Sequence, residues 1–283
     1  MYQLHWLVKR NMKLFFKDPK KIIMTFFSPI ITIVIFILFG RYLFASQLGK
    51  APIPDLVKSQ FADGSLLVGL LGLTSLTNAI SLSVFMVQDA EKKIFNDLAI
   101  TPIKPSIIRF SYLLVNILLN IIISVVMYLI VIIYMAANGT LGVMSVATGF
   151  IILGIILLGC VFNSALFSFI FSFLKSISAF SALSGALSSV SGFLIGAFIP
   201  LTILPAWLSA FSTVLPSTEV VSLLRYYIFS QNEVFASFPQ SYDITLANYS
   251  VQPWVGFVYV GGFTILSLIL AYVFTYNAKR QRN

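Results

Sequence analysis

Six apolar runs, each long enough to cross a lipid bilayer, constrain this chain more than any other feature of its sequence. A helix needs about 20 mainly apolar residues to span the hydrocarbon core. Only 10% of the 283 residues are charged, against about 25% in soluble domains. We therefore expect an all-α polytopic membrane protein that forms a single transmembrane domain over residues 1–283. The expected transmembrane helices occupy residues 22–44, 66–87, 107–136, 143–174, 177–199 and 254–276.

Residues 1–21 precede the first run and predict an amphipathic helix in the membrane interface. Arg10, Lys13 and Lys17 recur at helical spacing, and apolar side chains lie mostly on the other side. The basic face is expected to meet the lipid headgroups. Proline disfavours helix in the residue before it, so Asp18-Pro19 is expected to end this helix.

Two polar regions between the runs are expected on the outer side. Residues 45–65 predict a loop, and residues 200–253 contain short apolar pieces interrupted by prolines. The pieces at 204–213 and 217–230 are too short or too polar to span, so they predict external re-entrant or interfacial helices before the last span. Glu219 in the second piece is a candidate for the transport pathway or its gate.

The distribution of basic residues predicts the topology. Six spans place both termini on one side, and 14 of the 18 Lys and Arg residues fall on that side. Because Lys and Arg concentrate in cytoplasmic loops, we expect cytoplasmic termini and a multi-pass protein of the cell membrane. The same bias accounts for the net charge of +9 without a nucleic-acid partner. The four remaining basic residues are Arg41, Lys50, Lys58 and Arg225.

The sequence lacks the motifs that would give the chain an energy source or a catalytic centre. It has no G-x-x-x-x-G-K-[ST] phosphate loop, no Cys/His/Asp/Glu cluster with metal spacing, and one histidine and one cysteine. The predicted spans contain no ionisable residue well inside the hydrocarbon, which argues against ion coupling. We therefore expect no enzyme activity and no cofactor in this chain. A transport function would need a separate protein that supplies the energy.

The cytoplasmic segment 88–106 is the best candidate for contact with such an energy-supplying partner. It contains charges of both signs between two spans and predicts a short amphipathic helix that ends at Thr101-Pro102. Ile94 and Leu98 contribute an apolar side that fits a cleft, while the charges fix the register at its rim.

Small and polar residues within the spans predict close helix contacts or a pathway. Small residues recur at four-residue spacing in the fifth run, which lets helix backbones approach each other. A dimer seam, a pathway lining and packing within one chain all remain open. The residues concerned are Asn78, Ser181, Gly185, Ser188 and Gly192.

Several short motifs occur in a fixed order along the chain. They are Lys17-Asp18-Pro19, Glu91-Lys92-Lys93 with Asp97-Leu98 and Thr101-Pro102, Leu204-Pro205, Leu215-Pro216 and Leu223-Leu224-Arg225. This ordered set resembles the membrane subunits of type-2 ATP-binding-cassette (ABC) exporters of the bacterial drug- and antibiotic-export type. One departure is that the family often has a glycine where Ile94-Phe95-Asn96 stand.

The resemblance implies a permease subunit in the bacterial cell membrane that pairs with a second copy or a homologous permease. Separate ATPase subunits would bind ATP and magnesium. The implied cargo is a drug, an antibiotic, a peptide or a lipid-like compound. Alternatives are a polysaccharide or teichoic-acid exporter and a membrane assembly factor without transport. The implied ATPase-coupling residues are Glu91, Lys92, Lys93, Asp97, Leu98, Thr101 and Pro102.

Overall fold

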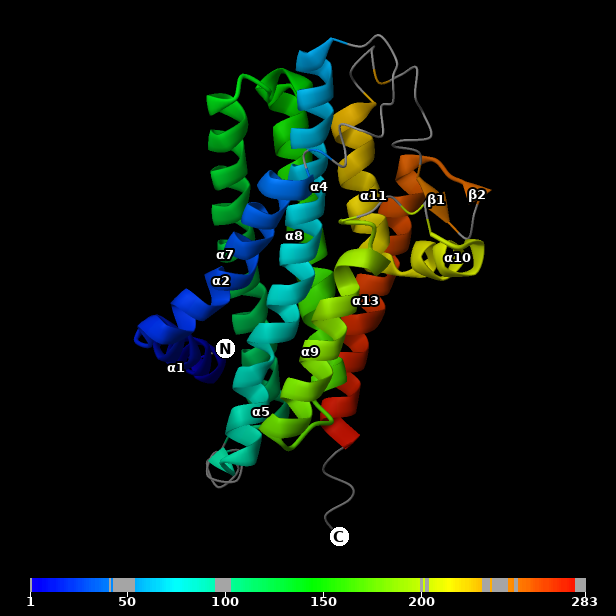
Figure 1. Cartoon of the computed structure of the whole chain (residues 1–283). Coiled ribbons are helices and arrows are strands. Elements are labelled where there is room, and N and C mark those ends of the chain that lie inside the picture. The colour runs from blue at the N-terminus through cyan, green and yellow to red at the C-terminus, as the bar shows by residue number, and fades with distance from the viewer. Residues whose placement is uncertain are drawn as a thin grey trace.

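The computed structural model is a bundle of long helices with one short helix across its side (Figure 1). It describes residues 2–40, 42, 54–94, 103–198, 201, 204–230, 235, 244–246 and 249–277. Two two-residue strands, β1 (Thr245–Leu246) and β2 (Tyr249–Ser250), pair antiparallel. The helices are α1 (Tyr2–Phe16), α2 (Pro19–Ile35), η1 (Phe36–Gly40), α4 (Asp55–Leu82), α5 (Val84–Glu91), α7 (Pro105–Ala137), η2 (Leu141–Val143), α8 (Val146–Phe171), α9 (Ile177–Leu194), α10 (Ala206–Val214), α11 (Pro216–Phe229) and α13 (Pro253–Asn277).

Six segments are long and apolar enough to span a membrane, which confirms the predicted all-α polytopic fold. They are α2 with η1, α4 with α5, α7, α8, α9 and α13. The segment formed by α4 and α5 has 37 residues and measures about 56 Å at ~1.5 Å per residue. Because the hydrocarbon core is about 30 Å thick, this segment projects well beyond it.

The expected loop over residues 45–65 is wrong in its second half, because α4 begins at Asp55 rather than at residue 66. The polar residues that suggested a loop are accommodated on the helix. Lys58 lies 3.5 Å from the Asp55 carboxylate. Asp63 is buried, and its carboxylate accepts a hydrogen bond of 2.8 Å from the Thr140 hydroxyl. Charged residues that find partners therefore extend the helix.

Two other predicted spans are shorter than expected for identifiable reasons. The fourth begins at Val146 instead of residue 143, because Ser145 caps it by accepting from the Thr148 amide at 3.2 Å. The fifth ends at Leu194 instead of residue 199. Gly196 has a φ of 70°, and the Ala197 amide donates to the Gly192 carbonyl at 3.1 Å. A left-handed glycine with such a bond is typical of a helix C-terminus.

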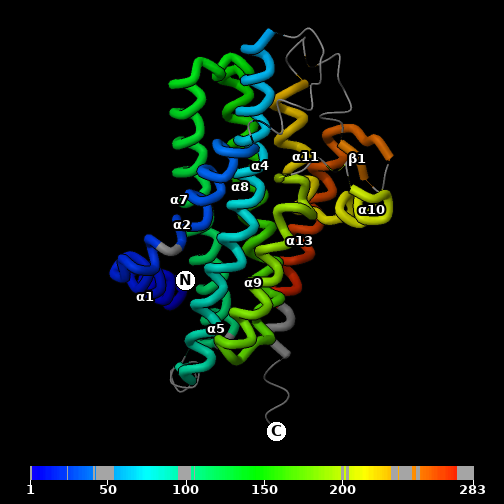
Figure 2. The backbone as a smooth tube through the Cα atoms, in the orientation of Figure 1, coloured from blue at the N-terminus to red at the C-terminus, as the bar shows by residue number. Residues whose placement is uncertain are grey.

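The core of the bundle surrounds α4, which packs against α7, α8, α9 and α11 (Figure 2). Helices α10 and α11 meet at a bend of 91°. Helix α11 then packs against α4, α8 and α13, and most of its side chains are buried. Helix α11 therefore enters the bundle. The sequence had left open whether this region is re-entrant or lies in the interface. Four of its buried side chains are Val221, Leu223, Leu224 and Phe229.

Helix α1 lies across the side of the bundle and packs against α7 (Figure 1). Its buried residues are Leu7, Asn11 and Phe15, spaced one helical turn apart. The break after it occurs at the predicted position. Asp18 caps α2 by accepting from the Lys21 amide at 3.3 Å, and Pro19 opens that helix.

Candidate functional site

One carboxylate joins three helices at the end of the bundle that leads into the predicted coupling segment. Asp89 on α5 lies 3.2 Å from a guanidinium nitrogen of Arg10 on α1. The Tyr112 hydroxyl on α7 donates to the same Asp89 oxygen. The Asp89 side chain is only 15% exposed, so this contact is shielded from solvent better than an ordinary surface ion pair. It holds the C-terminal end of α5 against α1 and α7.

The surroundings of Arg10 keep it charged. Partial burial lowers the pKa of the guanidinium, but Tyr112 and the Asp89 carboxylate outweigh that effect, and the net pKa is raised. Lys13 on the same helix and Lys17, which follows its last residue, are exposed. The structure pairs Arg10 with Asp89, and contact of the three basic residues with lipid headgroups stays a prediction. The helical spacing of the basic residues predicted the face of α1 on which Arg10 lies. Its pairing with Asp89, 79 positions away, depends on tertiary packing.

Glu91 connects the start of the coupling segment to α9. Its Oε1 accepts a hydrogen bond of 3.0 Å from the Ile177 amide, the first residue of α9. The first amides of a helix have no partner within the helix, and Ser176 at the N-cap makes no side-chain capping bond. A negative charge is also favourable at a helix N-terminus. Glu91 therefore caps α9 from a different part of the chain.

The backbone turns sharply immediately after Glu91. Lys92 ends α5, and Lys93 adopts a left-handed conformation with a φ of 58°. Both side chains are exposed. A left-handed residue that follows a helix is usually glycine. The other predicted coupling residues, Asp97, Leu98, Thr101 and Pro102, lie outside the described residues.

A polar network in the bundle interior was not recognised from the sequence. Asn120 on α7 donates to the Ser75 carbonyl at 2.8 Å and to the Ser164 hydroxyl at 3.2 Å. Asn163 on α8 donates to the Ser75 hydroxyl at 3.1 Å and accepts from Ser217 at 2.7 Å. These bonds connect α4, α7, α8 and α11. Asparagines within apolar runs are the signal that could have revealed it.

Two predicted pathway residues, Asn78 and Glu219, are buried inside the chain. Within the described part of the chain, the Asn78 amide nitrogen and both carboxylate oxygens of Glu219 have no hydrogen-bond partner. Glu219 faces α13, where a Cβ placed on Gly256 would lie 3.5 Å from its Oε2. Arg225 on the same helix donates instead to the Gly196 carbonyl at 2.8 Å.

The small residues of α9 divide between two faces. Ser181 and Gly185 are exposed, and a Cβ on Gly185 would meet no atom within 4 Å. Ser188 is partly exposed. Gly192 is buried, and a Cβ there would lie 2.2 Å from a ring carbon of Phe198. The structure thus brings Gly192 against its own chain and leaves Ser181 and Gly185 on an open face.

The described residues include no group of three or more His, Cys, Asp and Glu side chains that could hold a metal ion. Cys160 is a buried free thiol within hydrogen-bond reach of Ser124, at 3.3 Å.

Comparison with known proteins gave a family match. The model of a family described as ABC-2 type transporter matches residues 2–229. No match was found among curated protein sequences.

Proposed function

This chain belongs to the ABC-2 type transporter family, and we propose that it exports its cargo when a separate ATPase moves residues 91–102. It is the membrane permease component of an ABC transporter, and a separate subunit hydrolyses ATP. Members of this family generally work with such an ATPase subunit. The proposal adds the direction of transport, a cytoplasmic position for both termini, and the route by which the ATPase moves the membrane helices.

The hydrogen bond from Ile177 to Glu91 is the observation that best supports this route. A displacement of the coupling segment would act directly on the first turn of α9. The contact between Asp89 and Arg10 would transmit the same displacement to α1. In this proposal, Glu91, Lys92, Lys93 and the following residues to Pro102 receive the ATPase, and α9 and α1 respond.

We also propose that two copies of the permease form the pathway, with α9 and α2 near the seam. Only 17% of the most apolar stretch of α9 and 12% of that of α2 are buried within one chain. Ser181 and Gly185 on the open face of α9 would allow a close approach of the second copy. Small residues at such a contact are common in membrane proteins, where packing replaces the hydrophobic effect.

For the cargo, we propose an amphipathic compound, such as a drug, an antibiotic, a peptide or a lipid-like molecule. This choice follows the resemblance of the coupling and outer motifs to drug exporters. Transport of fluorescent amphipathic compounds into inside-out vesicles would support it. Transport restricted to a polysaccharide or teichoic-acid precursor would contradict it.

The coupling route is tested by replacing Glu91 in the complex with its ATPase. Glu91→Gln removes the charge at the start of α9 while leaving an amide oxygen, and Glu91→Ala removes the acceptor. A charge–helix interaction of about 1 kcal/mol corresponds to about a fivefold change. We expect Glu91→Ala to lower transport per ATP hydrolysed by about fivefold, and Glu91→Gln to have a smaller effect.

Lys92→Gln is the matched control, because Lys92 is adjacent, charged and exposed. It should leave transport per ATP close to that of the wild type. Complex assembly is measured in parallel by co-purification of the ATPase. If both Glu91 variants assemble normally and transport as efficiently as the wild type, Glu91 does not couple the ATPase to α9.

A further inference from the structure

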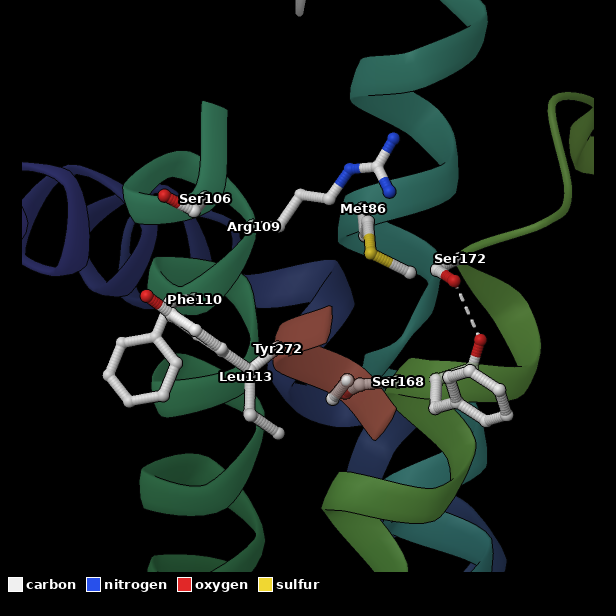
Figure 3. Close-up of a pocket in the computed structure, with 10 residues that line it drawn as sticks. Met86, Ser106, Arg109, Phe110, Leu113, Ser168, Ser172 and Tyr272 are labelled. Atoms are coloured by element: carbon white, nitrogen blue, oxygen red, sulfur yellow. Dashed lines mark hydrogen bonds between the residues drawn. The ribbon is translucent and has the colours of Figure 1, made fainter. Parts of the chain in front are cut away.

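A pocket opens between α5, α7, α8 and α13 near the end of the bundle that α1 crosses (Figure 3). Arg109 extends from α7 toward the helix that contains Met86, and three serine hydroxyls line the pocket. Apolar and aromatic side chains form the rest of its wall. The serines are Ser106, Ser168 and Ser172.

Arg109 is a partly buried cation without a partner among the residues that the structure describes. No hydrogen bond or ion pair joins its guanidinium to another residue in the described ranges, although a guanidinium has five donors. The two acidic groups on α5 have other partners, since Asp89 binds Arg10 and Glu91 binds the Ile177 amide. A partly buried cation in a pocket is most stable with an anionic ligand that accepts several hydrogen bonds.

The serine hydroxyls add donors to the same pocket. Ser106 and Ser168 make no side-chain hydrogen bond to the described protein, so both hydroxyls are free to donate to a ligand. The Ser172 hydroxyl donates to the Phe169 carbonyl at 2.7 Å. A phosphate group offers the guanidinium more acceptor oxygens than a carboxylate does.

The position of the pocket fits the polar boundary of a membrane leaflet. Arg109 lies four residues after the start of α7, or about 6 Å along the helix axis. The rim includes Tyr272, which is 63% exposed, and Phe110, which is 37% exposed. Exposed tyrosines are frequent at the headgroup level of membrane proteins, and such rings provide surface for acyl chains.

We propose that this pocket binds the phosphate of an anionic phospholipid, with the lipid chains against Phe110 and Tyr272. Arg109 would hold the phosphate, and the hydroxyls of Ser106 on α7 and Ser168 on α8 would meet other polar groups of the headgroup. Exposed basic residues at the same end of the chain favour a lipid with a net negative charge. The site requires neither the cargo nor the ATPase route proposed above. These basic residues are Lys92, Lys93 and Lys175.

The test measures lipid retention by the full chain with native mass spectrometry in detergent, titrated with phosphatidylglycerol or phosphatidylcholine. We expect the wild type to retain phosphatidylglycerol at least fivefold better than phosphatidylcholine. Arg109→Gln should abolish this preference, and Arg109→Lys should keep part of it, because lysine preserves the charge but not the fork geometry. Lys104→Gln removes an equal charge outside the pocket and should keep the preference.

Three outcomes would overturn the proposal. The first is an Arg109→Gln variant with the wild-type preference, and the second is an equal loss in Lys104→Gln, which would indicate diffuse surface charge. The third is displacement of the lipid by inorganic phosphate, because the site would then take a free anion. If Arg109→Gln does not fold, Ser106→Leu serves instead: it fills the pocket, leaves Arg109 in place, and should also lower phosphatidylglycerol retention.

Discussion

Helices α4 and α9 are both long and apolar enough to span a membrane, yet the chain uses them in opposite ways. In the most apolar stretch of α4, 83% of the residues are buried, against 17% in α9. Helix α4 packs against α2, α7, α8, α9 and α11. Much of α9 presents one face to the surroundings of the chain, and that face includes Ser181 and Gly185.

The main anchors of α9 lie near its two ends. Glu91 binds its first amide, and beyond its last turn the Gly196 carbonyl accepts from Arg225 at 2.8 Å. A helix held in this way can shift when an end is moved without disturbing the core. Helix α4 cannot, because its neighbours are in contact throughout. The comparison therefore predicts a fixed scaffold, α4, and a movable element, α9, within one chain.

The largest effect is expected from a methyl group added to the scaffold. A Cβ on Gly69 of α4 would lie 2.4 Å from the Ala197 carbonyl oxygen, which belongs to the backbone and cannot rotate away. We expect Gly69→Ala to destabilise the protein by about 1–3 kcal/mol, as overpacking does. Thermal unfolding in detergent measures the change.

The matched control is Gly185→Ala on α9, where no atom lies within 4 Å of the added carbon. Alanine favours helix by about 1 kcal/mol over glycine, so this variant, measured as a single chain without a second copy, should unfold at the same temperature or a higher one. If both variants lose stability equally, the distinction between scaffold and movable element does not hold.

A smaller effect is expected when hydrogen bonds of the polar network around α4 are removed. Asn163→Ala removes the bonds to Ser75 and Ser217. Interhelical hydrogen bonds in membrane proteins contribute about 0.6–1.7 kcal/mol, so the unfolding temperature should fall by less than in Gly69→Ala. The comparison variant is Ser181→Ala on the open face of α9, and its unfolding temperature should stay unchanged. A larger fall in Ser181→Ala would reverse the assignment of the two helices.

The smallest effect is expected from a substitution in the turn that follows α5. Lys93 has a φ of 58°, which disfavours residues with a side chain by about 1–2 kcal/mol. Lys93→Gly removes this strain but increases the entropy of the unfolded chain, so we expect a gain of less than about 1 kcal/mol. Lys92→Gly, at a φ of −74°, should lower stability instead. Equal changes in both variants would show that the left-handed turn stores no strain.

Part of this fold and site was predictable because it depends on local sequence. The six membrane-length helices follow from apolar runs, and the break between α1 and α2 follows from Asp18-Pro19. Glu91 was identified by its place in a charged segment and by the family motif. Its bond to Ile177, 86 positions away, could not be predicted, because nothing local indicates which helix will begin beside it.

The sequence by itself determined that the chain belongs in a membrane, that six of its segments are long and apolar enough to span one, and which polar segment follows α5. These properties depend on apolar length and on backbone restrictions that act within a few residues. Only the tertiary structure decided that α4 is enclosed and α9 is open, that Arg10 pairs with Asp89, and that Arg109 faces a pocket. In a lipid-facing chain, lipid and protein interior are equally apolar, so hydropathy does not distinguish a buried helix from an exposed one.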